Sequence, residues 1–249
     1  MPSFKDHFSQ DADRYAAFRP RYPASLFRAL SDAVARHDLA WDVGCGNGQL
    51  SAGLANVFGR VVATDASAEQ VAQAAAVPGV EYRCAPAEAS GCADGSVDLV
   101  TAAQAAHWFD LPAFYAEVRR VGRTGGAVAL ISYGVCHADE RVDPILQAFY
   151  WETLAPYWPP ERRWVEEGYR SLDFPFEALP APALSMQAAW TLEQLLGYVD
   201  TWSAVKQLRR GPEAAALPAF RQRLARAWGD PKHDCMINWP LALRLGRIG

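Results

Sequence analysis

Three closely spaced glycines after an apolar segment are the first residues here whose type and spacing could do chemistry. The run Trp41 to Gly48 reads W-D-V-G-C-G-N-G, and its three glycines are Gly44, Gly46 and Gly48. Glycine has no Cβ, so a ligand can lie directly against the backbone. A helical pattern follows at once, and its first amides are free to donate. This arrangement is typical of a site for a nucleotide-type cofactor.

The glycine spacing and the acid at Asp42 distinguish between two such cofactors. The dinucleotide fingerprint would place its third glycine at position 49, which is Gln49. A carboxylate at Asp42 would oppose a pyrophosphate, but it suits a cation such as the ammonium of a methionine moiety. The run therefore favours S-adenosylmethionine over NAD. Cys45 is interpreted as a small apolar filler of the loop rather than as a nucleophile.

A second acid, Asp65, ends the next predicted strand, 17 residues after Gly48. A carboxylate at this place can accept hydrogen bonds from both ribose hydroxyls, so it indicates an adenosine cofactor without choosing one. The alternative is a turn acid for the following helix. Ser67 is better placed for that task, because Ser67 and Gln70 have the spacing of a capping box.

These groups need elements that bring them together. Apolar runs predict buried strands, and helical periodicity fills the gaps between them. Strands that alternate with helices imply parallel βαβ units in a doubly wound sheet, which binds ligands outside the carboxyl ends of its strands. The glycine loop, Asp65, Ala87–Glu88 and Gln104–His107 all follow strand ends, so we expect them along one edge. The predicted strands cover residues 39–43, 61–65, 80–84, 97–103 and 127–132, with helices over 24–36, 50–58, a segment after Ser67, and 111–121.

The pattern changes after about residue 134. Prolines become frequent, and seven of the nine tryptophans lie beyond residue 150. Residues 191–205 predict one amphipathic helix. Residues 235–248 predict a strand that pairs with residues 184–190.

Composition excludes several classes of function. The chain has 249 residues, 51% of them hydrophobic, and a net charge of −4. It lacks the basic stripe of a nucleic-acid-binding protein, and its longest apolar stretch is too short to span a membrane. The polar N-terminus does not resemble a signal peptide, so a cytoplasmic location is expected. Five cysteines without Cys-x-x-Cys spacing, and histidines without ligand spacing, predict reduced thiols and no metal site.

The chain resembles the class I S-adenosylmethionine-dependent methyltransferases. It is most similar to their type 11 small-molecule branch, which includes trans-aconitate methyltransferase-like proteins. The resemblance covers residues 10–133 well and the remainder loosely, and Thr124 departs from the proline that the family usually has there. The motifs that carry it, in the family's order, are Y-A-A-F-R-P-R-Y-P at 15–23, residues 42–48, Asp65, Ala87–Glu88, residues 96–100, Q-A-A-H-W-F at 104–109 and residues 123–126.

This resemblance implies an α/β fold with a doubly wound, Rossmann-like, mostly parallel sheet. Residues 1–36 would be N-terminal helices that cover the cofactor, 37–133 the cofactor-binding core, and 134–249 a helical cap or lid with the final strands of the sheet. S-adenosylmethionine would be the cofactor, and the acceptor a small molecule methylated on oxygen, nitrogen or carbon. The chain would be a monomer or a homodimer.

The resemblance also assigns cofactor-binding roles. The glycines would surround the methionine and ribose, Asp65 would hold the ribose, and Ala87 and Glu88 would face the adenine beside Ala66. Arg19 would bind the methionine carboxylate, or else be a solvated arginine. The full set is Tyr15, Arg19, Tyr22, Asp42, Gly44, Cys45, Gly46, Gly48, Asp65, Ala66, Ala87, Glu88, Gln104 and Ala105.

His107 and Trp108 follow the fourth strand, where the transferred methyl group would lie. His107 could be the general base for a hydroxyl acceptor, or a hydrogen-bonded wall residue. Trp108, with Tyr22, could face the sulfonium through its ring, or pack against the lid. Trp151 and Tyr157 are candidates for an apolar acceptor pocket, although their spacing also fits core packing.

Two rival functions remain open from the sequence. An NAD-dependent oxidoreductase would share the glycine loop and Asp65. A methyltransferase-fold protein that binds the cofactor without transferring a methyl group would share every motif.

Overall fold

The computed structural model describes residues 20–249. The first part of the chain alternates strands and helices: α2 (Ala24–Asp32), β1 (Leu39–Val43), α3 (Gln49–Leu54), β2 (Arg60–Asp65), α4 (Ala68–Ala72), β3 (Val80–Cys84), β4 (Val97–Ala103), η1 (Ala106–Trp108), α5 (Leu111–Val121) and β5 (Gly122–Ser132). The second part is mainly helical: α6 (Asp143–Ala148), η2 (Phe149–Thr153), η3 (Ala155–Tyr157), α7 (Arg162–Glu166), β6 (Glu177–Leu179), β7 (Leu184–Trp190), α8 (Leu192–Asp200), α9 (Ser203–Leu208), α10 (Ala216–Trp228) and β8 (Cys235–Arg247).

The strands form one mostly parallel sheet in the order β3-β2-β1-β4-β5-β8-β6, with β7 paired to β8 off this path. The strands β3, β2, β1, β4 and β5 are parallel, and β8 runs antiparallel to β5. The strand order changes direction between β1 and β4, which is where doubly wound sheets bind ligands. The predicted α/β, Rossmann-like fold is confirmed.

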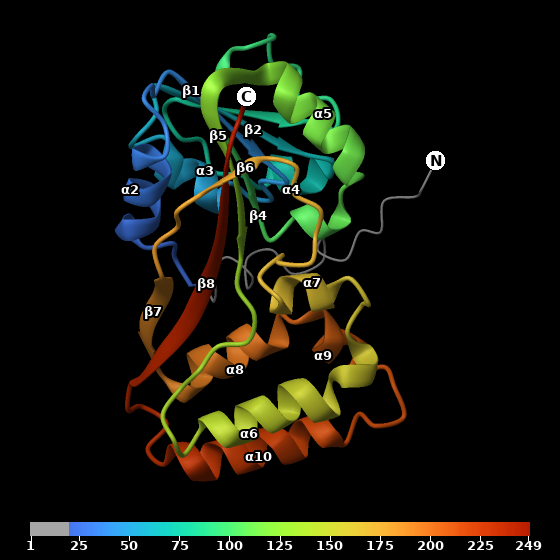
Figure 1. The fold of residues 1–249 in the computed structure, drawn as a ribbon. Helices are drawn as coiled ribbons and strands as arrows, with labels where there is room; N and C mark the ends of the chain where they lie inside the picture. The colour runs from blue at the N-terminus through green and yellow to red at the C-terminus, as the bar shows by residue number, and fades with distance from the viewer. Residues whose placement is uncertain (1–19) are drawn as a thin grey trace.

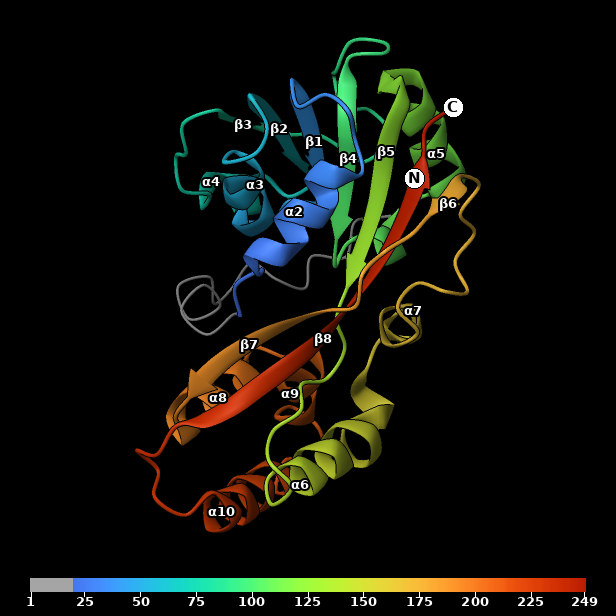
Figure 2. The ribbon, with the colours of Figure 1, turned by 60° about the vertical axis from the view of Figure 1, so that its left-hand side comes forward.

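The central strands β1, β2 and β4 are largely buried because helices cover both faces of the sheet (Figures 1 and 2). Successive strand residues point to opposite faces. Leu99 packs in one cluster with Leu26 of α2 and Leu54 of α3, whereas Val100 packs in a second cluster with Phe114 of α5. Strand β4 therefore contributes side chains to two hydrophobic clusters, one on each face of the sheet.

Local signals in the sequence set several helix starts as predicted. The Ser67 hydroxyl accepts from the amide of Gln70 at 3.3 Å, and Asp110 accepts from the amide of Ala113 at 3.3 Å. Each satisfies an amide of the first helical turn that has no partner inside the helix. The ends of β1, β3 and β4 lie where the apolar runs predict them.

Three predicted elements have wrong boundaries. The fifth strand begins at Gly122 and not at Ala127, and the glycine pair lies inside it. A Cβ on Gly126 would come within 2.7 Å of the Asp98 carbonyl oxygen, so glycine here permits close approach of two strands. The helices predicted over 24–36 and 50–58 are also shorter, ending at Asp32 and Leu54.

The single helix predicted over residues 191–205 is also wrong. The chain forms α8 and α9 instead, separated at Trp202, whose backbone is extended with φ −67° and ψ 132°. The Trp202 ring lies edge-on to Tyr150 and Tyr198, with centroid distances of 5.3 and 5.6 Å. The Trp202 ring is buried at the point where the helix breaks. Packing of this ring therefore overrides the helical periodicity of the segment.

The last strand joins the two parts of the molecule (Figure 2). The first half of β8 pairs with β7, from Trp190 opposite Cys235 to Leu184 opposite Leu241, as the sequence predicts. Its second half lies between β5 and β6 in the main sheet. Helices α6, α8, α9 and α10 gather beyond β7 around aromatic contacts such as Phe149 stacked on Phe220 at 3.8 Å. Within residues 20–249, none of the helices has the length and apolar character needed to cross a membrane.

Candidate active site

Four groups of predicted site residues lie at the carboxyl ends of neighbouring strands. The glycine loop follows β1, Asp65 ends β2, the loop with Ala87 and Glu88 follows β3, and residues 104–108 follow β4. Strands β3, β2, β1 and β4 are adjacent and parallel. The structure therefore brings these groups to one edge of the sheet, as the sequence predicts.

The glycine loop turns tightly between β1 and α3. Gly44, Gly46 and Gly48 have φ values of 66°, 56° and 86°, in the left-handed region that favours glycine. The amide of Cys45 donates to the Thr64 carbonyl on β2 at 3.0 Å, which ties the loop to the neighbouring strand. The Cys45 thiol is largely buried, and burial raises its pKa above the usual range. A raised pKa disfavours the nucleophilic thiolate, and the interpretation of Cys45 as a filler of the loop stays a prediction.

The three glycines are needed for different reasons. A Cβ on Gly44 would lie 2.4 Å from the Ala105 Cβ, and one on Gly48 would lie 2.2 Å from the Tyr82 hydroxyl. Both positions are crowded by the protein itself. A Cβ on Gly46 would meet only Gln70 Oε1, at an ordinary 3.7 Å. The space beside Gly46 is thus free of other atoms of the described chain.

Asp65 connects the glycine loop with the turn after β2. Its Oδ2 accepts from the amide of Gly46 at 2.8 Å, and its Oδ1 accepts from the amide of Ser67 at 2.9 Å. The second contact is the turn role considered from the sequence, and the structure shows it. Each carboxylate oxygen has a further lone pair, and Asp65 is only half-buried. A ribose role therefore stays a prediction beside the turn role, and the neighbouring Ala66 is exposed.

Asp42 lies behind the glycine loop. It is 1% exposed, and its two oxygens accept from the hydroxyls of Ser51 at 2.6 Å and Thr101 at 2.8 Å. Burial raises the pKa of Asp42 to about 6, although these two hydroxyls oppose the rise. Asp42 thus links β1 to α3 and β4 and supports the loop, and a direct contact with a ligand ammonium stays a prediction.

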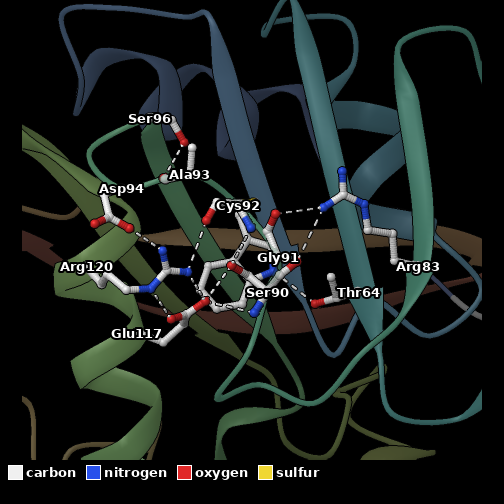
Figure 3. A network of polar contacts seen from close by, with 11 residues as sticks. Thr64, Arg83, Ser90, Gly91, Cys92, Ala93, Asp94, Ser96, Glu117 and Arg120 are labelled. Atoms are coloured by element: carbon white, nitrogen blue, oxygen red, sulfur yellow. Dashed lines mark hydrogen bonds and ion pairs between the residues drawn. The ribbon is translucent and has the colours of Figure 1, made fainter.

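The loop after β3 is held by a buried carboxylate on α5 (Figure 3). Glu117, 7% exposed, accepts from the amide of Ser90 at 2.8 Å and from its hydroxyl at 2.6 Å. Arg120 donates to Glu117 at 2.7 Å and to the Cys92 carbonyl at 3.0 Å, and it also bonds Asp94. This network fixes the loop that carries the two predicted adenine-binding residues.

Ala87 and Glu88 lie in that loop at the edge where the other groups gather. Ala87 is buried, and Glu88 Oε1 accepts from the amide of Asp110 at 3.3 Å. Glu88 therefore connects the loop after β3 with the start of α5. Its predicted role beside an exocyclic amine is not excluded by this contact, since a carboxylate accepts several hydrogen bonds.

Gln104 stands in a strained conformation at the end of β4, with φ 54°. Its Nε2 donates to the Tyr133 carbonyl at 2.7 Å, which sets the direction of the amide. Its Oε1 is buried and has no hydrogen-bond partner among residues 20–249. The next residue, Ala105, is also buried and lies against Gly44. A buried acceptor without a partner is costly, unless a bound group donates to it.

His107 lies in the short η1 turn and contacts the helical part of the chain. Its Nδ1 is 2.9 Å from the Tyr169 hydroxyl, and its ring centroid is 4.7 Å from that of Trp108. Burial, together with the positive charge of Arg162, lowers the pKa of His107 to about 3. The ring is therefore neutral at physiological pH. Trp108 is 36% exposed, so it lies at the rim and not in the core.

The remaining predicted residues fall in different places. Tyr22 is half-buried and lies edge-on to Tyr133, with ring centroids 6.5 Å apart. Tyr15 and Arg19 lie outside the described residues. Trp151 is 50% exposed and donates to Gln147 at 3.1 Å, and the Tyr157 hydroxyl donates to Glu213 at 3.2 Å. These two contacts lie within the helical part, so the structure does not bring Trp151 and Tyr157 to the strand edge.

Two residues of the site have no signal in the sequence. Tyr169 is fully buried beside His107. The positive charge of Arg162 is close enough to affect the pKa of both side chains. Arg162 forms an ion pair with Glu166 at 2.8 Å and lies over the Trp158 ring at 5.0 Å. Both residues come from the helical segment and belong to no motif, so only the fold reveals their place.

Comparisons with known proteins agree on one family. A family model for a methyltransferase domain matches residues 41–130. A Dictyostelium discoideum protein provisionally named a methyltransferase is 32% identical over 251 residues, which cover 98% of this chain and 95% of its own. A solved structure from Anaeromyxobacter dehalogenans, provisionally assigned as a type II methyltransferase, is 47% identical with a TM-score of 0.89 and covers 93% of this chain and 98% of its own. An uncharacterised methyltransferase of Mycobacterium tuberculosis is 37% identical over 125 residues, 50% of this chain and 51% of its own.

Proposed function

Because this chain belongs to the class I methyltransferases, we propose that it transfers a methyl group from S-adenosylmethionine to a small-molecule acceptor. The observation that carries this proposal is the edge of the sheet at the β1–β4 switch point. There the space beside Gly46, next to the carboxylate of Asp65, holds no atom of residues 20–249 nearer than Gln70 Oε1 at 3.7 Å. Family membership favours methyl transfer over the NAD-dependent alternative.

The residues present fit S-adenosylmethionine. Asp65 offers a half-buried carboxylate for ribose hydroxyls, and bare backbone at Gly46 permits close approach. Gln104 Oε1 is a buried acceptor that an ammonium or hydroxyl donor would satisfy. When bound, the cofactor supplies a methyl group activated on a sulfonium. We assign its binding to the glycine loop, Asp65, the loop at Ala87–Glu88 and the strand end at Gln104–Ala105.

The protein's own contribution is placement. Methyl transfer is an in-line displacement, so the rate depends on holding the acceptor atom in line and excluding water. His107 and Trp108 lie on the turn after β4, beside the proposed methionine end of the cofactor. We assign them to the wall against which the acceptor is positioned, with Trp108 at its rim.

One assay tests both activity and acceptor. The protein is incubated with S-adenosylmethionine labelled in the methyl group and an extract of small metabolites. The expected result is label in a new small molecule, whose structure then names the methylated atom. Binding of S-adenosylhomocysteine without any labelled product would support the alternative in which the fold binds the cofactor without transferring the group. Binding of NADH with no response to S-adenosylhomocysteine would contradict the proposal.

Replacing Asp65 by alanine should weaken binding of S-adenosylhomocysteine by roughly tenfold to a hundredfold. A hydrogen bond to a charged group contributes about 1.5–3 kcal/mol, and the Asp65→Ala change also releases the Gly46 amide. The affinity is measured by calorimetry, and urea unfolding checks that the variant folds. Glu69→Ala is the matched control, because it removes the same charge from an exposed position on α4. Equal affinities for both variants would refute a ribose role for Asp65.

A further inference from the structure

The hydroxyl of Tyr169 joins the helical part of the chain to the catalytic edge. It lies 2.9 Å from Nδ1 of His107, and the two ring centroids are 5.9 Å apart. Tyr169 comes from the connection between α7 and β6, whereas His107 follows β4. Two segments 62 residues apart in sequence therefore meet at this hydrogen bond.

Tyr169 is held rigidly at this place. Its side chain is fully buried, its amide donates to the Trp164 carbonyl at 2.7 Å, and its carbonyl accepts from Arg244 on β8. Its backbone has φ 61°, a left-handed conformation that is strained for a bulky residue. Among residues 20–249, the other non-glycine residue with positive φ is Gln104. Strained residues persist where the surroundings fix them and cluster at functional sites, and here both lie beside His107.

The neighbours of the Tyr169 hydroxyl decide which way its proton points. A tyrosine hydroxyl has one hydrogen to donate and lone pairs to accept with. The backbone amides of Ala106 and His107 face this oxygen as donors, and the nearby positive charge of Arg162 offers it no acceptor either. Among residues 20–249, the hydrogen-bond partner of this hydroxyl that can accept is Nδ1 of His107. If Nδ1 carried a hydrogen instead, the buried hydroxyl proton would lose its acceptor, which is costly.

The charge state of His107 completes the assignment. Arg162 of α7 is the charged group that acts on the His107 ring, and its positive charge adds to burial in lowering the pKa of His107 to about 3. Burial also raises the pKa of Tyr169 above its usual range, so the hydroxyl is neutral and keeps its proton. A neutral imidazole has one N–H. With Nδ1 accepting from Tyr169, that hydrogen is on Nε2.

We propose that Tyr169 is a positioning residue that fixes His107 in the Nε2–H tautomer, so that His107 donates a hydrogen bond to the methyl acceptor and removes no proton from it. The second half of this inference rests on the proposed function. It predicts an acceptor that needs no deprotonation and has one lone pair for the hydrogen bond and another for the attack, such as a carboxylate. As the attacking lone pair forms the new bond to carbon, the carbon–sulfur bond breaks with its electron pair going to sulfur, and His107 keeps its proton.

Nitrogen-15 NMR of the wild-type chain of residues 1–249, labelled at histidine, tests the tautomer without any acceptor. The chain has five histidines, and a His107→Gln variant identifies the His107 signals by their loss. The expected result is a protonated Nε2 and an unprotonated Nδ1 from about pH 5 to 8. Hydrogen on Nδ1, or a doubly protonated ring in this range, would overturn the inference.

A pair of tyrosine variants tests the role of the hydroxyl. In Tyr169→Phe, His107 should become a mixture of both tautomers, because nothing then selects Nδ1 as acceptor. Tyr115→Phe is the matched control: Tyr115 is also buried, but its hydroxyl donates to the Asp173 carbonyl at 2.8 Å, so the His107 signals should not change. An unchanged tautomer in Tyr169→Phe would remove the positioning role. If that variant does not fold, the wild-type tautomer alone still decides.

The NMR result is independent of methyl transfer. An Nε2–H tautomer in a protein that labels no metabolite would contradict the proposed function and leave the positioning role intact. Active methyl transfer with hydrogen on Nδ1 of His107 would contradict the positioning role of Tyr169 and leave the proposed function intact.

Discussion

Replacing Gly46 by alanine is expected to leave the protein folded and to lower its affinity for S-adenosylhomocysteine at least about tenfold, or about 1.4 kcal/mol. The added Cβ would meet only Gln70 Oε1, at 3.7 Å, so the described chain has room for it. It would instead occupy the space that we assign to the cofactor. Calorimetric titration with S-adenosylhomocysteine measures the loss.

Gly95→Ala provides the matched control for this variant. Gly95 has φ 58°, nearly the same as the 56° of Gly46, and a Cβ there would meet no atom of residues 20–249 within 4 Å. The left-handed backbone should cost each alanine variant about 1–2 kcal/mol of stability. Gly95 precedes β4 and so lies at the opposite edge of the sheet. We expect equal stability loss in both variants but weaker binding only in Gly46→Ala, and equal affinities would place the cofactor elsewhere.

The second large effect concerns Glu117, which anchors the loop after β3 (Figure 3). Glu117→Gln should lower the free energy of unfolding by about 3 kcal/mol near neutral pH. Burial opposes ionisation of this carboxyl, but the Arg120 guanidinium and the donors of Ser90 outweigh it and lower the pKa of Glu117 to about 2, from an ordinary 4.5. Urea unfolding of both proteins measures the difference.

The pH dependence of this difference has a definite sign. A carboxyl whose pKa is lowered by folding stabilises the protein fully above its ordinary pKa of 4.5, and the contribution disappears as pH falls toward about 2. The wild type and Glu117→Gln should therefore converge in acid. Glu81→Gln is the control, because Glu81 also pairs with arginines but is 45% exposed, so its loss should be small. A difference between wild type and Glu117→Gln that stays constant with pH would contradict the anchoring role of the charge.

The sequence predicts the parallel sheet well because its signals are local. Strands β1 and β4 are short apolar runs bounded by turn residues, and Asp110 and Ser67 are side chains that act on amides three residues away. The pairing of β7 with β8 is also predicted, but the continuation of β8 between β5 and β6 in the main sheet is visible only in the fold. The edge that these strands form then places the glycine loop, Asp65 and His107 together.

The errors arise where distant contacts override local pattern. Trp202 breaks a helix that periodicity favours because its ring is buried between two tyrosines. Asp42 belongs to the predicted motif, but its hydrogen bonds to Ser51 and Thr101 are visible only in the fold. Tyr169 is the clearest case: it lies in a loop without a motif, and only the fold brings it to His107.

The path of β8 determines how the two parts of the molecule can move. Leu241 pairs with Leu184 on β7, and the next residue, Ala242, pairs with Ser132 on β5. A flexible loop between two bodies would let each rotate at little cost, but here a rotation must twist one continuous strand that is hydrogen-bonded on both sides of this point. A rotation of the helical part is therefore transmitted to the sheet through β8. Bending at residues 241–242 is resisted by the hydrogen bonds of two strand pairs, β7–β8 and β5–β8.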